Sequence, residues 1–480
     1  MLRKWRYFIL IVTLVLFGAC GKQEARYIFF FIGDGMGHTQ ISSAERYLAA
    51  MENKSGIIPL AMNLAPATGY ATSFSASKHI TDSGAAGTAL ATGFKTSNGT
   101  VSMDAEHRYP LKTLAETAKE RGLKVGIVTT VDIDHATPAV FYAHQPSRSN
   151  YYEIAAQLAY SDFDFFAGGD FRKKKDPKGN SEQDIVDQIK QNGFVFVNNA
   201  TAFRYLEPGA GRVVFIHPDS NDEYAMPYVI DLDEGSITQD AMLQKAVAML
   251  EGPEGFFIMF EGGKIDWACH ANDAKTSILE TLAFDDAIRV ALEFYNKHRK
   301  HTLIVITADH ETGGMTMGTS YGDDNIDLSK LKWQTGSFTE LTREFSDSRA
   351  SMIEQYGEDH VKAHPEWAFD FAEKQTGIGD ESKGLGLNEY ERGELQTAYL
   401  KSFEKLNWEN PYEYILYGGY DPFMMSVSRM LSRKAGIGWT TFSHTAVPLP
   451  VRAFGVGAER FNGYYDNTDI PDKILQLMVK

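Results

Sequence analysis

Residues 27–32 read Tyr-Ile-Phe-Phe-Phe-Ile and lead directly into Gly33-Asp34-Gly35. An unbroken apolar run of this length lacks the polar alternation of a half-exposed strand and is typical of a strand covered on both faces. Similar runs recur at residues 125–128, 194–197, 213–216, 256–260, 303–306 and 451–456. The sequence therefore predicts a sheet whose strands lie inside the molecule.

Helical patterns separate these runs, at residues 111–119, 154–159, 241–250 and 274–295. Strands that alternate with helices predict an α/β fold, with a mainly parallel central sheet flanked by helices on both faces. Residues from about 316 to 437 break the alternation, because they contain polar helical patterns at 338–356, 389–403 and 422–433 and no strong strand run. We expect this part of the chain to be a largely helical insertion.

The overall charge argues against one class of function. The chain has 480 residues, with 47 Lys and Arg against 63 Asp and Glu, and a formal net charge of −16. We therefore expect no basic surface for nucleic-acid binding. A hydrophobic content of 43% is sufficient for a large core.

The N-terminus has the pattern of an export signal. Basic residues lie within residues 1–6, an apolar run covers 7–17, and two small residues precede Cys20. The apolar run is shorter than a membrane span requires, which favours a signal peptide. The ending resembles a bacterial lipoprotein cleavage site, so we expect residues 1–19 to be removed and Cys20 to carry a lipid anchor in the periplasm or cell envelope. An uncleaved anchor and ordinary secretory cleavage stay open.

Acidic and imidazole side chains follow three of the predicted strands. Asp34 lies in the glycine-rich turn after residues 27–32, and Asp309 and His310 follow the run at 303–306. The carboxyl ends of strands in an open α/β sheet are where ligands bind. Any one of these residues could be a surface or capping residue, but several at one sheet edge favour a metal site.

The third strand end adds Glu261, Asp266 and His270. Asp266 and His270 are four residues apart, so one turn of helix would present both on the same face. Carboxylate and imidazole ligands suit zinc, and an all-oxygen subset suits magnesium.

A candidate nucleophile lies in the small-residue stretch 80–93. Asp82 or Ser83 would begin a helix there, and a helix N-terminus favours an anion. Either residue could instead be a plain N-cap. Because the stretch does not match the Gly-x-Ser-x-Gly pattern, a metal would have to activate the hydroxyl.

Together these residues resemble the alkaline phosphatase family of the bacterial and animal type. The shared motifs follow the family's order along the chain: Gly-Asp-Gly-Met-Gly at 33–37, Thr-Asp-Ser-Gly-Ala-Ala at 81–86, Ala-Thr-Pro at 136–138, Ser-Arg at 147–148, Glu-Gly-x-x-Ile-Asp-x-x-x-His at 261–270, Thr-Ala-Asp-His at 307–310 and Ser-His-Thr at 443–445. The resemblance covers nearly the whole chain after the signal.

The resemblance implies two zinc ions and one magnesium ion. The implied ligands are Asp266, His270 and His444 for the first zinc, Asp34, Asp309 and His310 for the second, and Asp34, Thr137 and Glu261 for magnesium. Because ligands from Asp34 to His444 must converge, we expect residues 20–480 to form a single catalytic domain, although the length alone would suggest about three.

The resemblance also implies residues that bind substrate. Arg148 matches the arginine that holds the substrate phosphate, a task that suits a planar fork of donors. His135 and Trp267 are also assigned to substrate binding by the resemblance. His135 stands where the best-known bacterial pattern has an aspartate near the magnesium, and Trp267 where it has a lysine that contacts phosphate through water, so the third site could take zinc instead of magnesium. Asp82 would orient Arg148 or cap its helix.

The implied activity is hydrolysis of phosphate monoesters through a phosphoserine at Ser83. A phosphodiesterase of the same superfamily is the alternative, and a non-catalytic lipoprotein that binds metal or phosphate is a more distant one. Family members are often dimers, so a homodimer is open. We expect Cys269 to be a small buried residue and not a ligand, because on a helix it would point away from His270.

Overall fold

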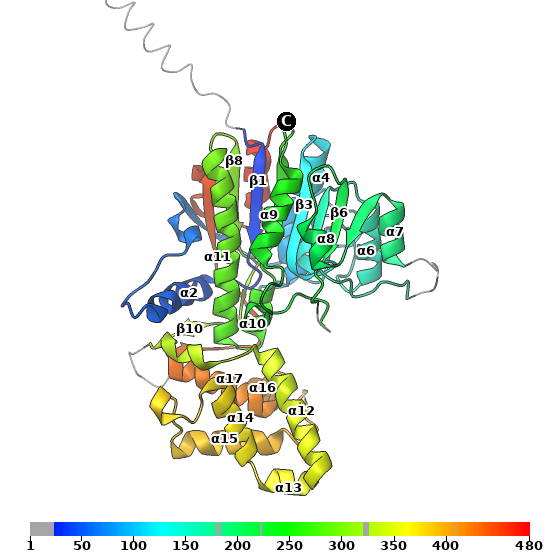
Figure 1. Ribbon diagram of the computed structural model, residues 1–480. Helices are drawn as coiled ribbons and strands as arrows, with labels where there is room; N and C mark the ends of the chain where they lie inside the picture. The colour runs from blue at the N-terminus through cyan, green and yellow to red at the C-terminus, as the bar shows by residue number, and fades with distance from the viewer. Residues whose placement is uncertain (1–23, 178, 180–183, 221–222, 320–325, 408) are drawn as a thin grey trace, which may run out of the picture.

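The predicted apolar runs all become strands of a ten-stranded sheet in the computed structural model (Figure 1). The run at residues 194–197 is an edge strand with Val195 exposed, so the prediction that it is covered on both faces is wrong. The structure describes residues 24–177, 179, 184–220, 223–319, 326–407 and 409–480. The strand order is β14-β2-β13-β8-β1-β7-β3-β4-β6-β5. These strands are β1 (Tyr27–Ile32), β2 (Ala67–Thr72), β3 (Lys124–Asp132), β4 (Phe165–Gly169), β5 (Phe194–Val197), β6 (Arg212–Ile216), β7 (Phe256–Glu261), β8 (Thr302–Thr307), β13 (Leu449–Gly455) and β14 (Gly463–Asp466).

Only β13 runs against its neighbours in this sheet, pairing antiparallel with β2 and β8. The other strand pairs of this sheet are parallel. The mainly parallel α/β fold predicted from the sequence is therefore confirmed.

Side chains of β1 enter a different core on each face of the sheet. Phe29 and Phe31 belong to one hydrophobic cluster, whereas Ile28, Phe30 and Ile32 belong to the other. All five side chains are fully buried, and burying each contributes roughly 1.5–3 kcal/mol. This explains why β1 has no polar alternation.

Helices cover both faces of the sheet. They are α2 (His38–Met51), α3 (Ser83–Thr92), α4 (Leu114–Glu120), α5 (Ala136–Ala139), α6 (Tyr151–Tyr160), α7 (Ile185–Gln191), α8 (Ala200–Arg204), α9 (Gln239–Leu250), α10 (Lys264–His270), α11 (Ala274–Lys297) and α18 (Asp469–Leu477). In Figure 1, β1 is seen between α11 and α9. Helix α4 starts later than the periodicity predicts, because a capping box formed by Thr113 and Glu116 sets its first turn.

Three strands of the sheet escape a search for apolar runs. β2 alternates buried and exposed residues and is rich in small ones, β4 contains two glycines, and β14 is a largely exposed edge strand. Each lacks the continuous apolar run that marks a central strand.

The chain leaves the sheet at β10 (Thr316–Met317) and returns at β11 (Ile437–Gly438), and these two strands pair antiparallel. Among the described residues between them, the regular elements are helices: η3 (Leu328–Trp333), α12 (Phe338–Tyr356), α13 (Glu358–Ala363), α14 (Glu366–Thr376), η4 (Glu381–Lys383), α15 (Glu389–Lys401), α16 (Pro411–Tyr417) and α17 (Pro422–Ala435). Figure 1 shows α12–α17 gathered beyond α10, at the end of the sheet. The ring of Phe345 stacks against Trp367 and Phe423 within this group.

The predicted signal peptide and Cys20 lie outside the described residues. None of the helices in the described part of the chain is both long and apolar enough to span a membrane.

Candidate metal and phosphate site

Strands β1, β7 and β8 bring three carboxylates to one edge of the sheet. Ile32 is paired with Glu261 on one side and with Thr307 on the other, so the three strands end in register. Asp34 and Asp309 follow just beyond these ends. The site therefore forms at the carboxyl edge of the parallel strands, as the sequence predicts.

His310 lies at the centre of one group of ligand atoms. Its Nε2 is 3.4 Å from Asp34 Oδ1 and 3.3 Å from Asp309 Oδ2. Ser83 Oγ lies 3.2 Å from the same nitrogen. Asp34, Asp309 and His310 are fully buried and could hold one metal ion directly beside the Ser83 hydroxyl.

A second group surrounds Asp266. His270 Nε2 is 3.3 Å from Asp266 Oδ2, and His444 Nε2 lies 3.2 Å from His270 Nε2. His444 arrives on β12 (His444–Thr445), which pairs with β9 (Glu311–Thr312) beside His310. Asp266, His310 and His444 also lie close enough together to share an ion, so the two groups adjoin.

Hydrogen bonds to the outer ring nitrogens orient these histidines. His270 Nδ1 contacts the Phe442 carbonyl at 2.6 Å, and His444 Nδ1 contacts the Thr81 carbonyl at 2.9 Å. A carbonyl only accepts, so each Nδ1 donates. When the ring is neutral, the lone pair of Nε2 is then free for a metal ion. Burial opposes protonation of His270, but the Asp266 carboxylate raises the pKa of His270 to about 9.

Thr312 connects the two groups and was missed by the sequence analysis. Its hydroxyl donates to Asp266 Oδ1, and its oxygen lies 3.2 Å from His310 Nδ1. Because the hydroxyl proton is used on Asp266, the Thr312 oxygen can accept from His310 Nδ1. No residue-type signal marks such a threonine; only its position two residues after His310 could have suggested it.

The third group contains Asp34, Glu261 and His135. Thr137 donates to Asp34 Oδ2 at 3.2 Å, and Thr129 donates to Glu261 Oε2. His135 Nδ1 lies 4.0 Å from Glu261 Oε1. The structure thus brings Thr137 to Asp34 as expected, and it adds His135, assigned from sequence to the substrate side, to the candidate ligands.

The donor atoms of these groups fit divalent cations. Asp34 Oδ1, Asp309 Oδ2, Glu261 Oε1 and His135 Nδ1 are buried, and no described residue hydrogen-bonds to them. Burial and mutual repulsion raise the pKa of Asp309 to about 7 and of Glu261 to about 8. Buried oxygen and imidazole atoms that lack partners are what a bound cation would satisfy.

Asp82 performs both of the roles that the sequence left open. Its Oδ1 accepts from the backbone N–H of Ala85 at 3.0 Å and of Gly99 at 2.9 Å, which caps α3. Its Oδ2 accepts from Arg148 Nη1 at 3.0 Å. Burial opposes ionisation, but Arg148 and these backbone donors hold the pKa of Asp82 below its usual value. Arg148 also lies 2.9 Å from His135 Nε2.

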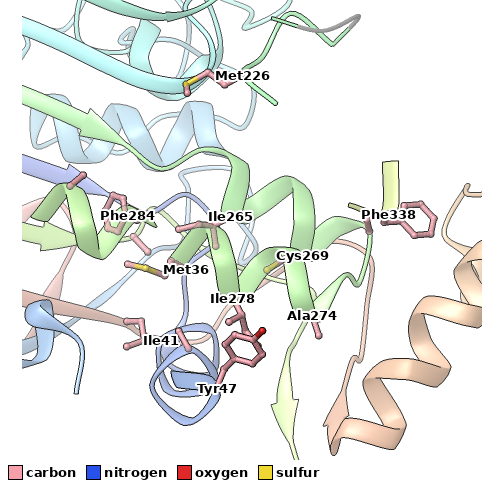
Figure 2. Close-up of a cluster of buried hydrophobic side chains, with 14 of the residues drawn as sticks. Met36, Ile41, Tyr47, Met226, Ile265, Cys269, Ala274, Ile278, Phe284 and Phe338 are labelled. Carbon is pink, nitrogen blue, oxygen red and sulfur yellow. The ribbon is translucent and has the colours of Figure 1, made fainter. Parts of the chain in front are cut away.

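Trp267 and Cys269 diverge from the same helix. Trp267 packs edge-to-face on His135, with ring centroids 6.0 Å apart. Figure 2 shows Cys269 within the hydrophobic cluster that contains Ile278 and Tyr47. Its Sγ lies 3.2 Å from Ser277 Oγ, and burial raises the pKa of the thiol. The prediction that Cys269 is a buried thiol is confirmed.

Comparison with known proteins agrees with this geometry. The family profile described as alkaline phosphatase matches residues 25–389. Alkaline phosphatase 3 of Bacillus subtilis is 30% identical over 95% of this chain and 90% of its own length. The structure of a cold-active alkaline phosphatase from Shewanella sp. has a TM-score of 0.75 and 29% identity, covering 95% of this chain and all of the other.

A further solved relative is the alkaline phosphatase of the Antarctic bacterium TAB5, with 25% identity and a TM-score of 0.63 over 95% of this chain and 98% of the TAB5 chain. A mutant of the TAB5 enzyme, named His 135 Asp in that protein's own numbering, holds magnesium in a site called M3. The match over most of the chain, together with the relative at 30% identity, shows that this chain belongs to the alkaline phosphatase family, the metal-dependent hydrolases of phosphate monoesters.

Proposed function

We propose that the chain hydrolyses phosphate monoesters in two steps, through a phosphoserine at Ser83. The observation that carries this proposal is the position of Ser83 Oγ, 3.2 Å from His310 Nε2 and beside the buried carboxylates of Asp34 and Asp309. Ser83 is also the first residue of α3, where free backbone N–H groups favour the negative charge of phosphate.

Three metal ions fit the donor groups. We assign zinc to Asp266, His270 and His444, a second zinc to Asp34, Asp309 and His310, and magnesium to Asp34, Thr137 and Glu261. Bound at these positions, divalent cations would lower the pKa of the Ser83 hydroxyl and stabilise charge on the leaving oxygen. His135 adjoins the third group, so zinc is the alternative there.

Arg148 holds the phosphate group during both steps. Its Nη1 is braced by Asp82, and its remaining donors can bind two phosphate oxygens in parallel. The Ser83 oxygen attacks phosphorus and loses its proton to solvent, while the ester oxygen leaves with the bonding electron pair and takes up a proton. Water then displaces Ser83 from phosphorus, which restores the hydroxyl and releases inorganic phosphate.

The closest alternative activity is diester hydrolysis. A monoester carries one more negative charge than a diester, and Arg148 together with a third cation site would favour it. The test is the rate ratio for phenyl phosphate and a phenyl alkyl diester with purified protein lacking residues 1–20. We expect the monoester to be preferred, with activity lost on chelation and restored by zinc. A preferred diester would overturn the assignment.

We further propose that the protein is exported and anchored through a lipid on Cys20, and that it forms a homodimer. Support for the anchor is the basic and apolar segment that ends in small residues before Cys20. Mass spectrometry of the N-terminal peptide, and detergent partitioning of wild type and Cys20→Ser, test the anchor. Sedimentation of the protein lacking residues 1–20 tests the dimer.

A further inference from the structure

We propose that Arg172 forms a second oxyanion subsite, so that the enzyme favours phosphate monoesters that carry another phosphate or carboxylate near the ester being cleaved. The inference deepens the proposed function and depends on it. It is carried by the contacts of Arg172, a residue outside every metal group described above.

Arg172 repeats the arrangement that prepares Arg148 for phosphate. Arg148 is braced by one aspartate, with Nη1 donating to Asp82 at 3.0 Å. Arg172 is braced more firmly, because Nε and Nη2 donate to the two oxygens of Asp132 at 2.9 and 3.0 Å. A guanidinium fixed along one edge keeps its other donors in a set direction, which suits recognition of an oxyanion.

Aromatic rings hold the Arg172 guanidinium in place. Its central carbon lies 5.4 Å from the ring centroid of Tyr151, 5.9 Å from Tyr224 and 5.8 Å from Trp267. Within the described part of the chain, no hydrogen bond uses Nη1, and the side chain is 28% exposed. Arg172 therefore has a donor that solvent or a ligand can reach.

A short series of contacts connects Arg172 with the phosphate-binding arginine. Arg172 packs on Trp267, Trp267 packs on His135, and His135 Nε2 lies 2.9 Å from Arg148 Nη2. Tyr151 follows Arg148 by three residues at the start of α6. Arg172 thus lies on the Trp267 side of the site, separated by one aromatic ring from His135, the residue that contacts Arg148.

A purely structural role is the competing explanation. Asp132 is buried and needs a cation, and Asp134 accepts from the backbone N–H of Arg172 at 3.2 Å. Loss of Arg172 would then lower activity on all substrates equally. A subsite would instead lower activity only on substrates with a second anionic group, and this difference can be measured.

The experiment compares wild type and Arg172→Gln on two substrate pairs. The pairs are phenyl phosphate with 3-carboxyphenyl phosphate, and adenosine 5′-monophosphate with adenosine 3′,5′-bisphosphate, so that an ester bond is cleaved in every substrate. We expect the substitution to lower kcat/KM for the more anionic member by about 10–100-fold relative to its partner, mainly through KM, as for loss of a charged hydrogen bond. Because both kcat/KM values scale with the fraction of folded enzyme, their ratio is independent of that fraction.

Two further variants act as controls. Arg172→Lys keeps the charge but loses the fork, and we expect a smaller change in the ratio. Arg212→Gln removes an arginine that packs on Phe194 and donates to the carbonyl of Ser161, without contact with the site; it should leave the ratio unchanged.

The outcomes separate the two proposals. An unchanged ratio in Arg172→Gln for both pairs overturns the subsite while leaving phosphomonoesterase activity intact. A change confined to the adenosine pair assigns the subsite to phosphate, and a change in both pairs assigns it to oxyanions in general. Wild-type protein that turns over neither phenyl phosphate nor adenosine monophosphate would contradict the proposed function itself.

Discussion

Two buried carboxylates, Asp309 and Asp273, differ in what surrounds them. Asp309 Oδ2 has no hydrogen bond from a described residue, and it faces His310 and the carboxylate of Asp34. Asp273 Oδ1 accepts from Thr276 N at 3.0 Å and Gln334 Nε2 at 2.9 Å. Its Oδ2 accepts from Phe338 N at 2.7 Å and Thr276 Oγ1 at 2.6 Å.

The difference shows that burial alone does not identify a metal site. Asp273 is as buried as Asp309, yet its charge is fully used in capping α11 and fastening α12 to it. Asp309 Oδ2 lacks a hydrogen-bond donor, and neighbouring carboxylates repel its negative charge. The ionised side chain is therefore unfavourable until a cation binds. Both regions contain a buried aspartate, but only the region of Asp309 has a carboxylate oxygen without a hydrogen-bond donor from a described residue.

The sharpest test makes the same substitution in both regions, starting with Asp309→Asn. We expect metal content to fall and phosphomonoesterase activity to drop by at least about 100-fold, since even supporting residues cost 10–100-fold. In metal-free protein, Asn should maintain or raise the free energy of unfolding, because it removes a buried charge. Metal analysis, phosphate release and urea unfolding after chelation measure these three effects. Near-normal activity would contradict the assignment.

Thr312 tests how the metal groups are held together. Thr312→Val removes the hydroxyl that donates to Asp266 and lies 3.2 Å from His310 Nδ1. We expect zinc affinity to fall by about 10–100-fold, and Thr312→Ser to restore most of it. Competition with a zinc-binding dye measures affinity directly. Equal zinc affinities of the Thr312→Val and Thr312→Ser variants would show that the hydroxyl has no role.

Asp273→Asn provides the matched change in the fully bonded region. The substitution replaces one accepting oxygen by an amide N–H₂, which then faces hydrogen-bond donors. The free energy of unfolding should therefore fall by about 1–3 kcal/mol. Metal content should be unchanged, because Asp273 lies in none of the metal groups. Urea unfolding and metal analysis check both statements. A loss of metal equal to that of Asp309→Asn would erase the distinction between the regions.

The smallest effect concerns a buried cation. Burial lowers the pKa of Lys275 to about 8, from a usual value of 10.5. Between these values the folded protein binds fewer protons than the unfolded chain, so this residue makes stability rise with pH above 8. Urea unfolding from pH 8 to 10 should show a steeper rise for wild type than for Lys275→Met. Equal slopes would contradict the prediction.

The central strands, and the candidate metal ligands at their ends, could be predicted from the sequence. Both depend on local patterns: a continuous apolar run identifies a strand, and motifs mark Asp34, Asp309 and His310. The run does not show whether the strand is central, because β5 has the same pattern at the edge of the sheet. Strands β2 and β14 were missed because small or exposed residues carry no such pattern.

The partners that complete the site could not be predicted, since they depend on tertiary packing. Thr312 acts through a hydroxyl whose donor role depends on where Asp266 lies. The pairing of Arg172 with Asp132 joins residues 40 positions apart, and neither belongs to a motif. The sequence shows His135 as a departure from the family pattern. That His135 lies close to Glu261 could not be predicted, because their distance depends on the fold.

The most direct test of the account is whether phosphate becomes attached to Ser83. Zinc-loaded enzyme is mixed with an aryl phosphate, quenched in acid, and its peptides are examined by mass spectrometry. The account predicts one phosphoryl group on Ser83, absent in a Ser83→Ala variant that still binds metal and whose kcat falls on the order of 10⁶-fold. A phosphoryl group on another residue, or wild-type turnover by Ser83→Ala, would contradict it.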